Sequence, residues 1–194
     1  MSQLSFFSAE SLPASPDDLE GLLCGTGQAV RQGDVARVSV VVPATEQWRI
    51  DPLLACLAGL GLDGETLPAE ADGVAVRTPF SPLLVDLARR WSTAGAKRPP
   101  ADLTLDGPRL RWWVIAAGRH DDQGFLLKLS PQDESSWPGI GAALARAGVP
   151  GALVGPRADG PAYRLIGAKR LGRLRELVGS APVGVPEEAW PRGR

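Results

Sequence analysis

The chain carries few side chains suited to nucleophilic or metal-based chemistry. It has 194 residues, of which one is histidine and two are cysteine, so a metal site built from His and Cys ligands is not expected. Cys24 and Cys56 both lie in apolar patterns with helical spacing, and this setting predicts buried free thiols rather than a disulfide. His120 follows an apolar segment and precedes two aspartates, and we expect it in a surface turn.

Charge is spread unevenly over the chain, although the net charge is only −1. Residues 1–96 hold 6 arginines and 12 acids, a net of −6, whereas residues 97–194 hold 15 lysines and arginines and 10 acids, a net of +5. Such asymmetry marks either a basic face that binds a polyanion or a solvated surface of uneven composition. The overall balance is far from that of a strongly basic protein.

The elements that must position these residues begin with an apolar segment at 19–27. Ser15, Pro16 and two aspartates precede this segment, a pattern that starts a helix. Gly21 and Gly25 are four residues apart and share one helix face, where bare backbone lets a second helix approach closely. The alternative is a short core helix. Further along, the pattern predicts a strand at 36–42, a helix at 53–60, a hairpin of strands 65–69 and 74–77, and a helix at 83–91 capped by Ser81.

The same order of elements follows a proline-rich break at 97–100. We predict a helix at 110–118, a strand at 124–130, a helix capped by Ser136, a hairpin of strands 152–155 and 162–166, and a closing helix at 171–178. Both halves therefore have the order helix, strand, helix, hairpin, helix, and Leu19 and Arg37 map onto Leu110 and Lys128 with one offset of 91 residues. The sequence predicts an α+β fold of two halves, 1–96 and 110–194, joined by a linker at 97–109 and related by a pseudo-two-fold axis.

Residues 19–27 resemble the nine-residue LAGLIDADG signature of homing endonucleases, matching it at Leu19, Gly21, Leu22 and Gly27. The segment 110–118 is similar to the signature at its two ends. The runs 97–100 and 185–188 resemble the lysine-x-x-proline run that often leads into this helix. The resemblance covers residues 16–190 and extends to the repeated order of elements.

This resemblance implies two signature helices packed side by side, with saddle-shaped antiparallel sheets that lie on duplex DNA. The helix seam would contain Gly21, Gly25, Trp113 and Ala117. In the family, an acid at the eighth signature position holds the divalent metal for phosphodiester cleavage, but these positions are Thr26 and Ala117 here. The pair Trp112 and Trp113 also departs from the pattern, and so bulky a ring predicts a wider helix contact.

Loss of both acids predicts a protein without catalytic residues, metal or cofactor. In this respect the chain resembles the non-cleaving LAGLIDADG domain of WhiA-type bacterial sporulation regulators, although its length leaves no room for their helix-turn-helix domain beyond the two halves. The alternative is an endonuclease with displaced metal ligands at Asp34, Asp121 and Asp122. Acids that directly follow a helix are more often solvated turn residues.

Cationic side chains on the predicted sheets are the candidates for contact with DNA. Strand alternation places Arg37, Ser39 and Val41 on one face of the strand in the first half. In the second half it places Leu126, Lys128 and Ser130 together on one face of their own strand. Lys169, Arg170 and Arg173 lie at the start of the last helix, either as a phosphate-contacting patch or as a solvated helix face. The candidates are Arg37, Arg77, Lys128, Arg157, Arg164, Lys169, Arg170 and Arg173.

We therefore predict a catalytically inactive, DNA-binding module related to transcription or genome maintenance. The alternative is a protein-interaction module that exposes Tyr163 and aliphatic side chains on the saddle. We expect a monomer with pseudo-dimeric halves and duplex DNA or a protein as its partner. No run approaches 18 apolar residues, so no membrane span is predicted, and we expect a cytoplasmic protein. The composition, rich in Ala, Gly, Pro and Arg, is typical of a GC-rich bacterial genome.

Overall fold

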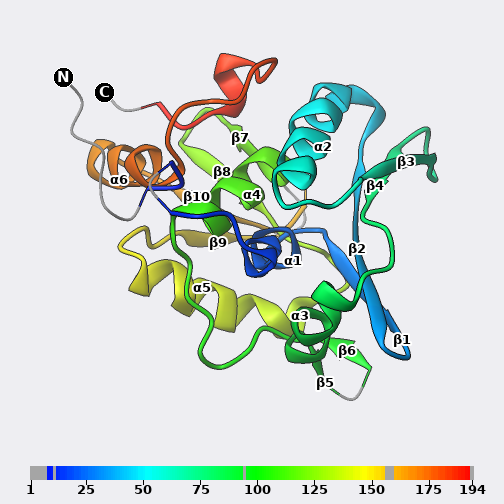
Figure 1. Ribbon diagram of the computed structural model, residues 1–194. Coiled ribbons are helices and arrows are strands. Elements are labelled where there is room, and N and C mark those ends of the chain that lie inside the picture. The colour runs from blue at the N-terminus through cyan, green and yellow to red at the C-terminus, as the bar shows by residue number, and fades with distance from the viewer. Residues whose placement is uncertain (1–7, 11, 94, 156–159, 193–194) are drawn as a thin grey trace.

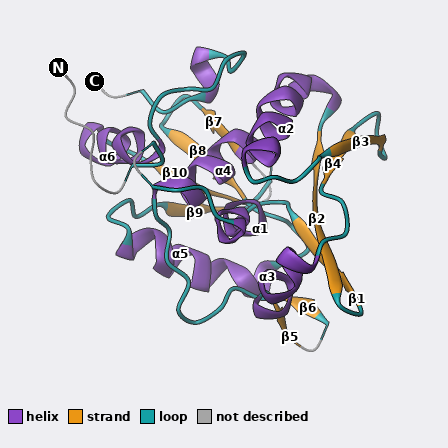
Figure 2. Ribbon diagram, in the orientation of Figure 1, coloured by secondary structure: helices purple, strands orange, loops and turns teal. Residues whose placement is uncertain are grey.

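Two four-stranded antiparallel sheets with one shared strand order form the frame of the protein (Figures 1 and 2). The computed structural model describes residues 8–10, 12–93, 95–155 and 160–192. The first sheet has the order β1-β2-β4-β3 and the second has the order β7-β8-β10-β9. The strands are β1 (Gln28–Gln32), β2 (Val35–Val42), β3 (Glu65–Pro68), β4 (Val74–Arg77), β7 (Gly118–His120), β8 (Phe125–Lys128), β9 (Ala152–Val154) and β10 (Ala162–Leu165). The predicted α+β fold with antiparallel sheets is confirmed.

Six α-helices of the described residues complete a repeated order of helix, two strands, helix, two strands, helix. They are α1 (Glu20–Cys24), α2 (Ile50–Gly59), α3 (Val85–Arg90), α4 (Gly107–Ala117), α5 (Trp137–Arg146) and α6 (Ala168–Val178). A two-stranded ladder, β5 (Ser92–Thr93) with β6 (Ala96–Lys97), lies between the repeats. Short 3-10 turns precede or follow several helices, at Pro16–Leu19, Ala44–Arg49, Pro82–Leu84, Glu134–Ser136 and Glu187–Ala189. None of the described helices is both long and apolar enough to span a bilayer.

Each four-stranded sheet contains one strand more than the sequence predicted, and the short ladder of β5 and β6 was not predicted either. Strand β1 escaped detection because it is an edge strand with largely exposed, polar residues, so it has no buried alternation. Strand β7 is only three residues long. It includes His120, which is half-buried and not in a surface turn: its ring nitrogens lie 3.2 Å from the carbonyl oxygens of Gly124 and Trp190, and its ring packs edge-on against Phe125.

The extra strands also show that the offset of 91 residues does not extend into the sheets. Gln28 pairs with Ser39, 11 residues later, whereas Arg119, its counterpart one residue after the helix glycine, pairs with Leu126, 7 residues later. The first hairpin is thus four residues longer, and Lys128 corresponds to Val41 instead of Arg37.

The helix boundaries follow local capping chemistry. Ser15 caps the first helical turn, as its position before Pro16 predicted, and it also forms a capping box with Asp18. Helix α4 begins at Gly107, three residues before the predicted start, because the Asp106 side chain accepts a hydrogen bond from the Arg109 amide. Ser136 does not cap α5 with its side chain, since its hydroxyl donates to the Lys97 carbonyl instead.

Helices α1 and α4 lie side by side in the middle of the core (Figure 1). Strand β2 shows the alternation that separates this core from solvent: Ala36, Val38, Val40 and Val42 are buried, and the residues between them face outward. Helix α3 packs on this inner side of β1 and β2, and α4 packs on the inner side of β8. Each sheet therefore keeps an outer face that no described helix covers.

Candidate functional site at the helix seam and the outer sheet faces

The seam between α1 and α4 is built from glycines on one helix and tryptophans on the other. A Cβ atom placed on Gly21 would lie 1.9 Å from the Arg109 carbonyl oxygen and 2.9 Å from the Trp112 Cβ. A Cβ atom on Gly25 would lie 3.0 Å from the Trp113 ring, whose indole nitrogen donates to the Lys128 carbonyl. The tryptophans therefore do not widen the helix contact, because glycine stands opposite them. Ala117 is buried at the end of α4.

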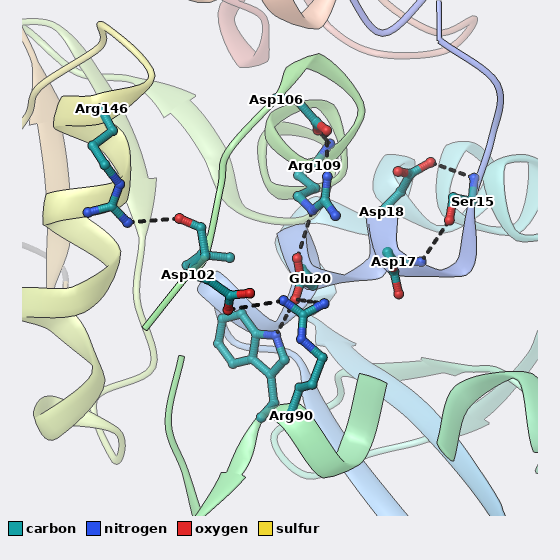
Figure 3. A network of polar contacts seen from close by, with 11 residues as sticks. Ser15, Asp17, Asp18, Glu20, Arg90, Asp102, Asp106, Arg109 and Arg146 are labelled. Atoms are coloured by element: carbon teal, nitrogen blue, oxygen red, sulfur yellow. Dashed lines mark hydrogen bonds and ion pairs between the residues drawn. The ribbon is translucent and has the colours of Figure 1, made fainter. Parts of the chain in front are cut away.

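At the amino end of α1, a buried carboxylate connects the seam to the residues around it (Figure 3). Glu20 on α1 is 1% exposed and accepts hydrogen bonds from the Trp91 indole at 3.1 Å and from the Arg109 guanidinium at 2.7 Å. Arg90 lies 3.4 Å from the same carboxylate and also contacts Asp102. Arg109 contacts Asp106 as well. Hence two arginines are shared among three acids, and the buried charge of Glu20 is compensated within the protein.

The carboxyl end of α1 is capped by a buried amine. The Lys97 Nζ atom lies 3.0 Å from the Gly25 carbonyl oxygen, 2.9 Å from that of Gly27 and 2.9 Å from an Asp133 carboxylate oxygen. Its side chain is 6% exposed. Burial lowers the pKa of the Lys97 amine, and the hydrogen bond to Asp133 opposes that shift. Gln28 donates to the same Asp133 oxygen at 3.0 Å. A positive charge at this position is favoured by the helix dipole.

The carboxyl end of α4 is capped by a buried guanidinium in the same manner. Arg49 is 1% exposed and donates to the carbonyl oxygens of Ile115 at 2.7 Å, Gly118 at 2.8 Å and Val114 at 3.3 Å. Its Nε atom lies 2.6 Å from Glu46, and its guanidinium stacks 4.2 Å from the centre of the Trp48 ring. Burial lowers the pKa of Arg49, and Glu46 opposes that shift. Both signature-like helices thus end on an internal cation.

These residues do not fit a divalent metal ion. Thr26 is half-buried and Ala117 is buried, and neither offers a carboxylate. The carbonyl oxygens at both helix ends already accept hydrogen bonds from Lys97 or Arg49. Among residues 8–10, 12–93, 95–155 and 160–192, no group of three or more His, Cys, Asp or Glu side chains is arranged to hold a metal.

The acids of the displaced-ligand alternative do not converge on the seam. Asp121 accepts hydrogen bonds from the amides of Gln123 and Gly124 and forms an ion pair with Arg164 at 2.6 Å. Asp122 is exposed. Asp34 is exposed in the turn after β1, and a five-residue strand separates it from the helix end by roughly 15 Å.

The outer face of the first sheet combines a polar row with exposed valines. Gln28, Ser39, Arg77 and Glu65 are register partners across the four strands. Arg77 forms an ion pair with Glu65 at 2.7 Å, and Arg37 stacks on the Phe80 ring at 4.7 Å. Val30 and Val41 are 47% and 49% exposed. Thus Arg77, a predicted DNA contact, is charge-balanced by its cross-strand neighbour.

The outer face of the second sheet brings Arg119, Leu126 and Arg164 into one row. Arg164 forms an ion pair with Asp121, and Lys128 lies on the same face, two residues beyond Leu126. Tyr163 points to the opposite side: it is buried, and its hydroxyl donates to the Trp137 carbonyl at 2.6 Å. The prediction that Tyr163 is exposed on the saddle was therefore wrong.

The three basic candidates near the carboxyl end of the chain are not part of the sheet faces. Lys169, Arg170 and Arg173 lie on α6, which packs against α4 on the helical side of the second sheet (Figure 1). Arg173 pairs with Glu176 on its own helix at 2.8 Å. Arg157 lies outside the described residues. Both cysteines are free thiols, as predicted, but Cys56 is half-buried whereas Cys24 is fully buried.

The Lys97–Asp133 pair makes the stability of the native state depend on pH in the acid range. Burial raises the pKa of the Asp133 carboxyl, but hydrogen bonds from Ser130 and Lys97 outweigh it, so the pKa lies below its usual value. The unfolded chain therefore binds a proton at Asp133 more readily than the native protein does. The pair stabilises the native state above pH about 4, and this stabilisation is lost as the pH falls through the native pKa of Asp133. We expect Asp133→Asn to be less stable than the parent at pH 7, with the difference shrinking toward pH about 2. Urea unfolding at a series of pH values measures this, and a constant difference would contradict it.

No family model matches this sequence, and no curated protein matches it. Among solved structures, the chain is similar to the homing endonuclease I-WcaI bound to its DNA recognition sequence. The TM-score is 0.58 at 10% sequence identity, and the match covers 92% of this chain and 83% of that one. The likeness shows a homing-endonuclease-like fold.

Proposed function

We propose that this protein binds duplex DNA with the outer faces of its two sheets and does not cleave it. The observation that carries the proposal is the pair of four-stranded sheets flanking one helix seam, the fold shared with an endonuclease seen on its DNA site. Absence of catalysis is supported by the helix ends, where Thr26 and Ala117 offer no carboxylate and the carbonyl groups accept hydrogen bonds from Lys97 and Arg49. A regulatory role in the cytoplasm, related to transcription or genome maintenance, fits a binder of this kind.

The salt dependence of binding reports how many cations reach phosphates. Four contacts, from Arg37, Arg77, Lys128 and Arg164, would give a slope of about −3.6 in log K against log salt, or about a 100-fold loss between about 50 and 200 mM. Because Arg77 and Arg164 are already paired with Glu65 and Asp121, we expect fewer than four contacts and a loss smaller than about 100-fold. Fluorescence anisotropy with a labelled random-sequence duplex measures the slope.

Substitution of Arg37 tests whether this face is the one that binds. Arg37→Ala should weaken binding and reduce the salt slope by about 1. Arg89→Ala is the matched control, since Arg89 is an exposed arginine on α3, the helix that covers the inner side of the first sheet, and it should bind as the parent does. No binding at about 50 mM salt, or equal losses in both variants, would overturn the proposal.

Cleavage is tested separately from binding. We expect a supercoiled plasmid to remain intact with the protein in Mg²⁺ or Mn²⁺, and a chelator to leave the affinity for DNA unchanged. Metal-dependent nicking that disappears in Asp121→Asn or Asp34→Asn would instead establish the displaced-ligand endonuclease.

The exposed valines favour a second candidate function, which is binding of a protein by the first sheet. Val30 and Val41 are both about half exposed on a face whose Arg77 charge is balanced, and a bound protein would remove this apolar area from water. This function predicts a partner that co-purifies after nuclease treatment and is lost in Val41→Lys. A partner that nuclease releases would point to DNA.

A further inference from the structure

Three oxygen atoms surround the Lys97 ammonium, one for each of its three protons. Two are main-chain carbonyl oxygens, from Gly25 and Gly27, and the third belongs to Asp133, all at 2.9–3.0 Å. Carbonyl and carboxylate oxygens are also the ligands that hard cations such as Ca²⁺ take in proteins. The loop that ends α1 therefore forms a cation cradle, and a side chain of the same protein occupies it.

The carboxyl end of α4 has the same construction. The Arg49 guanidinium meets the carbonyl oxygens of Val114, Ile115 and Gly118 and is balanced by Glu46. Each cation caps a helix that is distant from it in sequence. Arg49 precedes α2 but caps α4. Lys97 follows α3 but caps α1, and its partner Asp133 also follows α3. The two cations thus tie the α1 side of the molecule to the α4 side at the same end of the seam.

We infer that Lys97 is a built-in cation, a side-chain ammonium that permanently fills a cation site at the end of α1 and makes the seam independent of any bound metal. The charge balance supports this inference. One ammonium and one carboxylate sum to zero in a nearly dry site, whereas a divalent ion with Asp133 alone would leave one positive charge uncompensated. The inference does not depend on DNA binding.

Removal of the lysine side chain should create a site that an external cation can fill. Lys97→Ala removes the equivalent of propylammonium and leaves Asp133 and two carbonyls without their donor, so we expect Tm to fall by about 10 °C. Added propylammonium should then raise Tm in a concentration-dependent manner, because it binds only the folded variant. Differential scanning fluorimetry with propylammonium chloride measures this, and a rise supports the cradle. CaCl₂ should raise Tm less than propylammonium does, because a divalent ion beside one carboxylate keeps an uncompensated positive charge.

Three controls keep the test decisive. Tetramethylammonium chloride at equal ionic strength cannot donate hydrogen bonds and should have no effect. Lys169→Ala, at an exposed lysine of α6, should respond to no cation. Lys97→Met keeps all but the last atom of the side-chain length without its charge and covers the case in which the alanine variant is unfolded. A Met variant as stable as the parent, an Ala variant that no cation stabilises, or equal responses to tetramethylammonium would each overturn the inference.

Discussion

Gly21→Ala should be among the most destabilising single changes in this protein, although it adds one methyl group. The new Cβ would lie 1.9 Å from the Arg109 carbonyl oxygen and 2.9 Å from the Trp112 Cβ. Both belong to α4, so relief requires movement of a whole helix at the centre of the core. Overpacking in cores costs about 1–3 kcal/mol when side chains can adjust, and we expect at least about 3 kcal/mol here. Urea unfolding monitored by tryptophan fluorescence measures the loss.

Gly172→Ala is the matched control for Gly21. Gly172 lies inside α6, and nothing lies within 4 Å of its added Cβ. Alanine is favoured over glycine in a helix interior by about 0.5–1 kcal/mol, so this variant should be more stable than the parent. If both glycine variants changed stability in the same direction, the close approach of α1 to α4 would not be the reason for Gly21.

The predictions that rested on local signals were largely right. Strand 36–42 lies within β2, whose buried side alternates with outward residues as a period of two requires. Ser15 and Ser81 both cap the helical turns that their position before a proline indicated. These features are encoded within a few neighbouring residues, so a single sequence contains them in full.

The roles of Lys97 and Arg49 could not be predicted, because the carbonyl groups that they cap are 65 to 72 residues away in sequence. Lys97 falls in the predicted linker at 97–109, and Arg49 lies before the predicted helix at 53–60, in a stretch for which nothing was predicted. Helix ends need partners for their carbonyl groups, but no local pattern identifies a distant side chain as the partner. Only the fold brings each cation to its helix end.

Charge pairing on the sheets was hidden for a similar reason. Arg77 was predicted to contact DNA, but its register partner on β3 is Glu65. A shift of one residue in that register would place the two side chains on opposite faces, and the sequence does not fix the register. The neighbouring Trp112 and Trp113 were misread because their fit depends on which residues of α1 stand opposite them.

Glu20→Gln should destabilise the protein by about 3–5 kcal/mol, the usual cost of breaking a buried ion pair. The amide has nearly the same shape as the carboxylate, but it removes the negative charge that faces Arg109 at 2.7 Å and Arg90 at 3.4 Å. Its NH₂ group must also face a donor, either the Arg109 guanidinium or the Trp91 indole. Asp106 and Asp102 still compensate the two arginines in part, which places our expectation at the lower end of that range. Chemical unfolding at neutral pH measures the change.

Asp86→Asn makes the same acid-to-amide exchange at an exposed pair and isolates the effect of burial. Asp86 lies 3.0 Å from Arg89, one turn along α3, and both side chains are well exposed. Exposed pairs contribute about 0–1 kcal/mol, so this variant should unfold at nearly the parent's urea concentration. Similar losses in both variants would mean that Glu20 acts only as one more surface charge. A large loss confined to Glu20 would identify its carboxylate as the group that holds α1, α3 and α4 together at the end of the seam opposite Lys97 and Arg49.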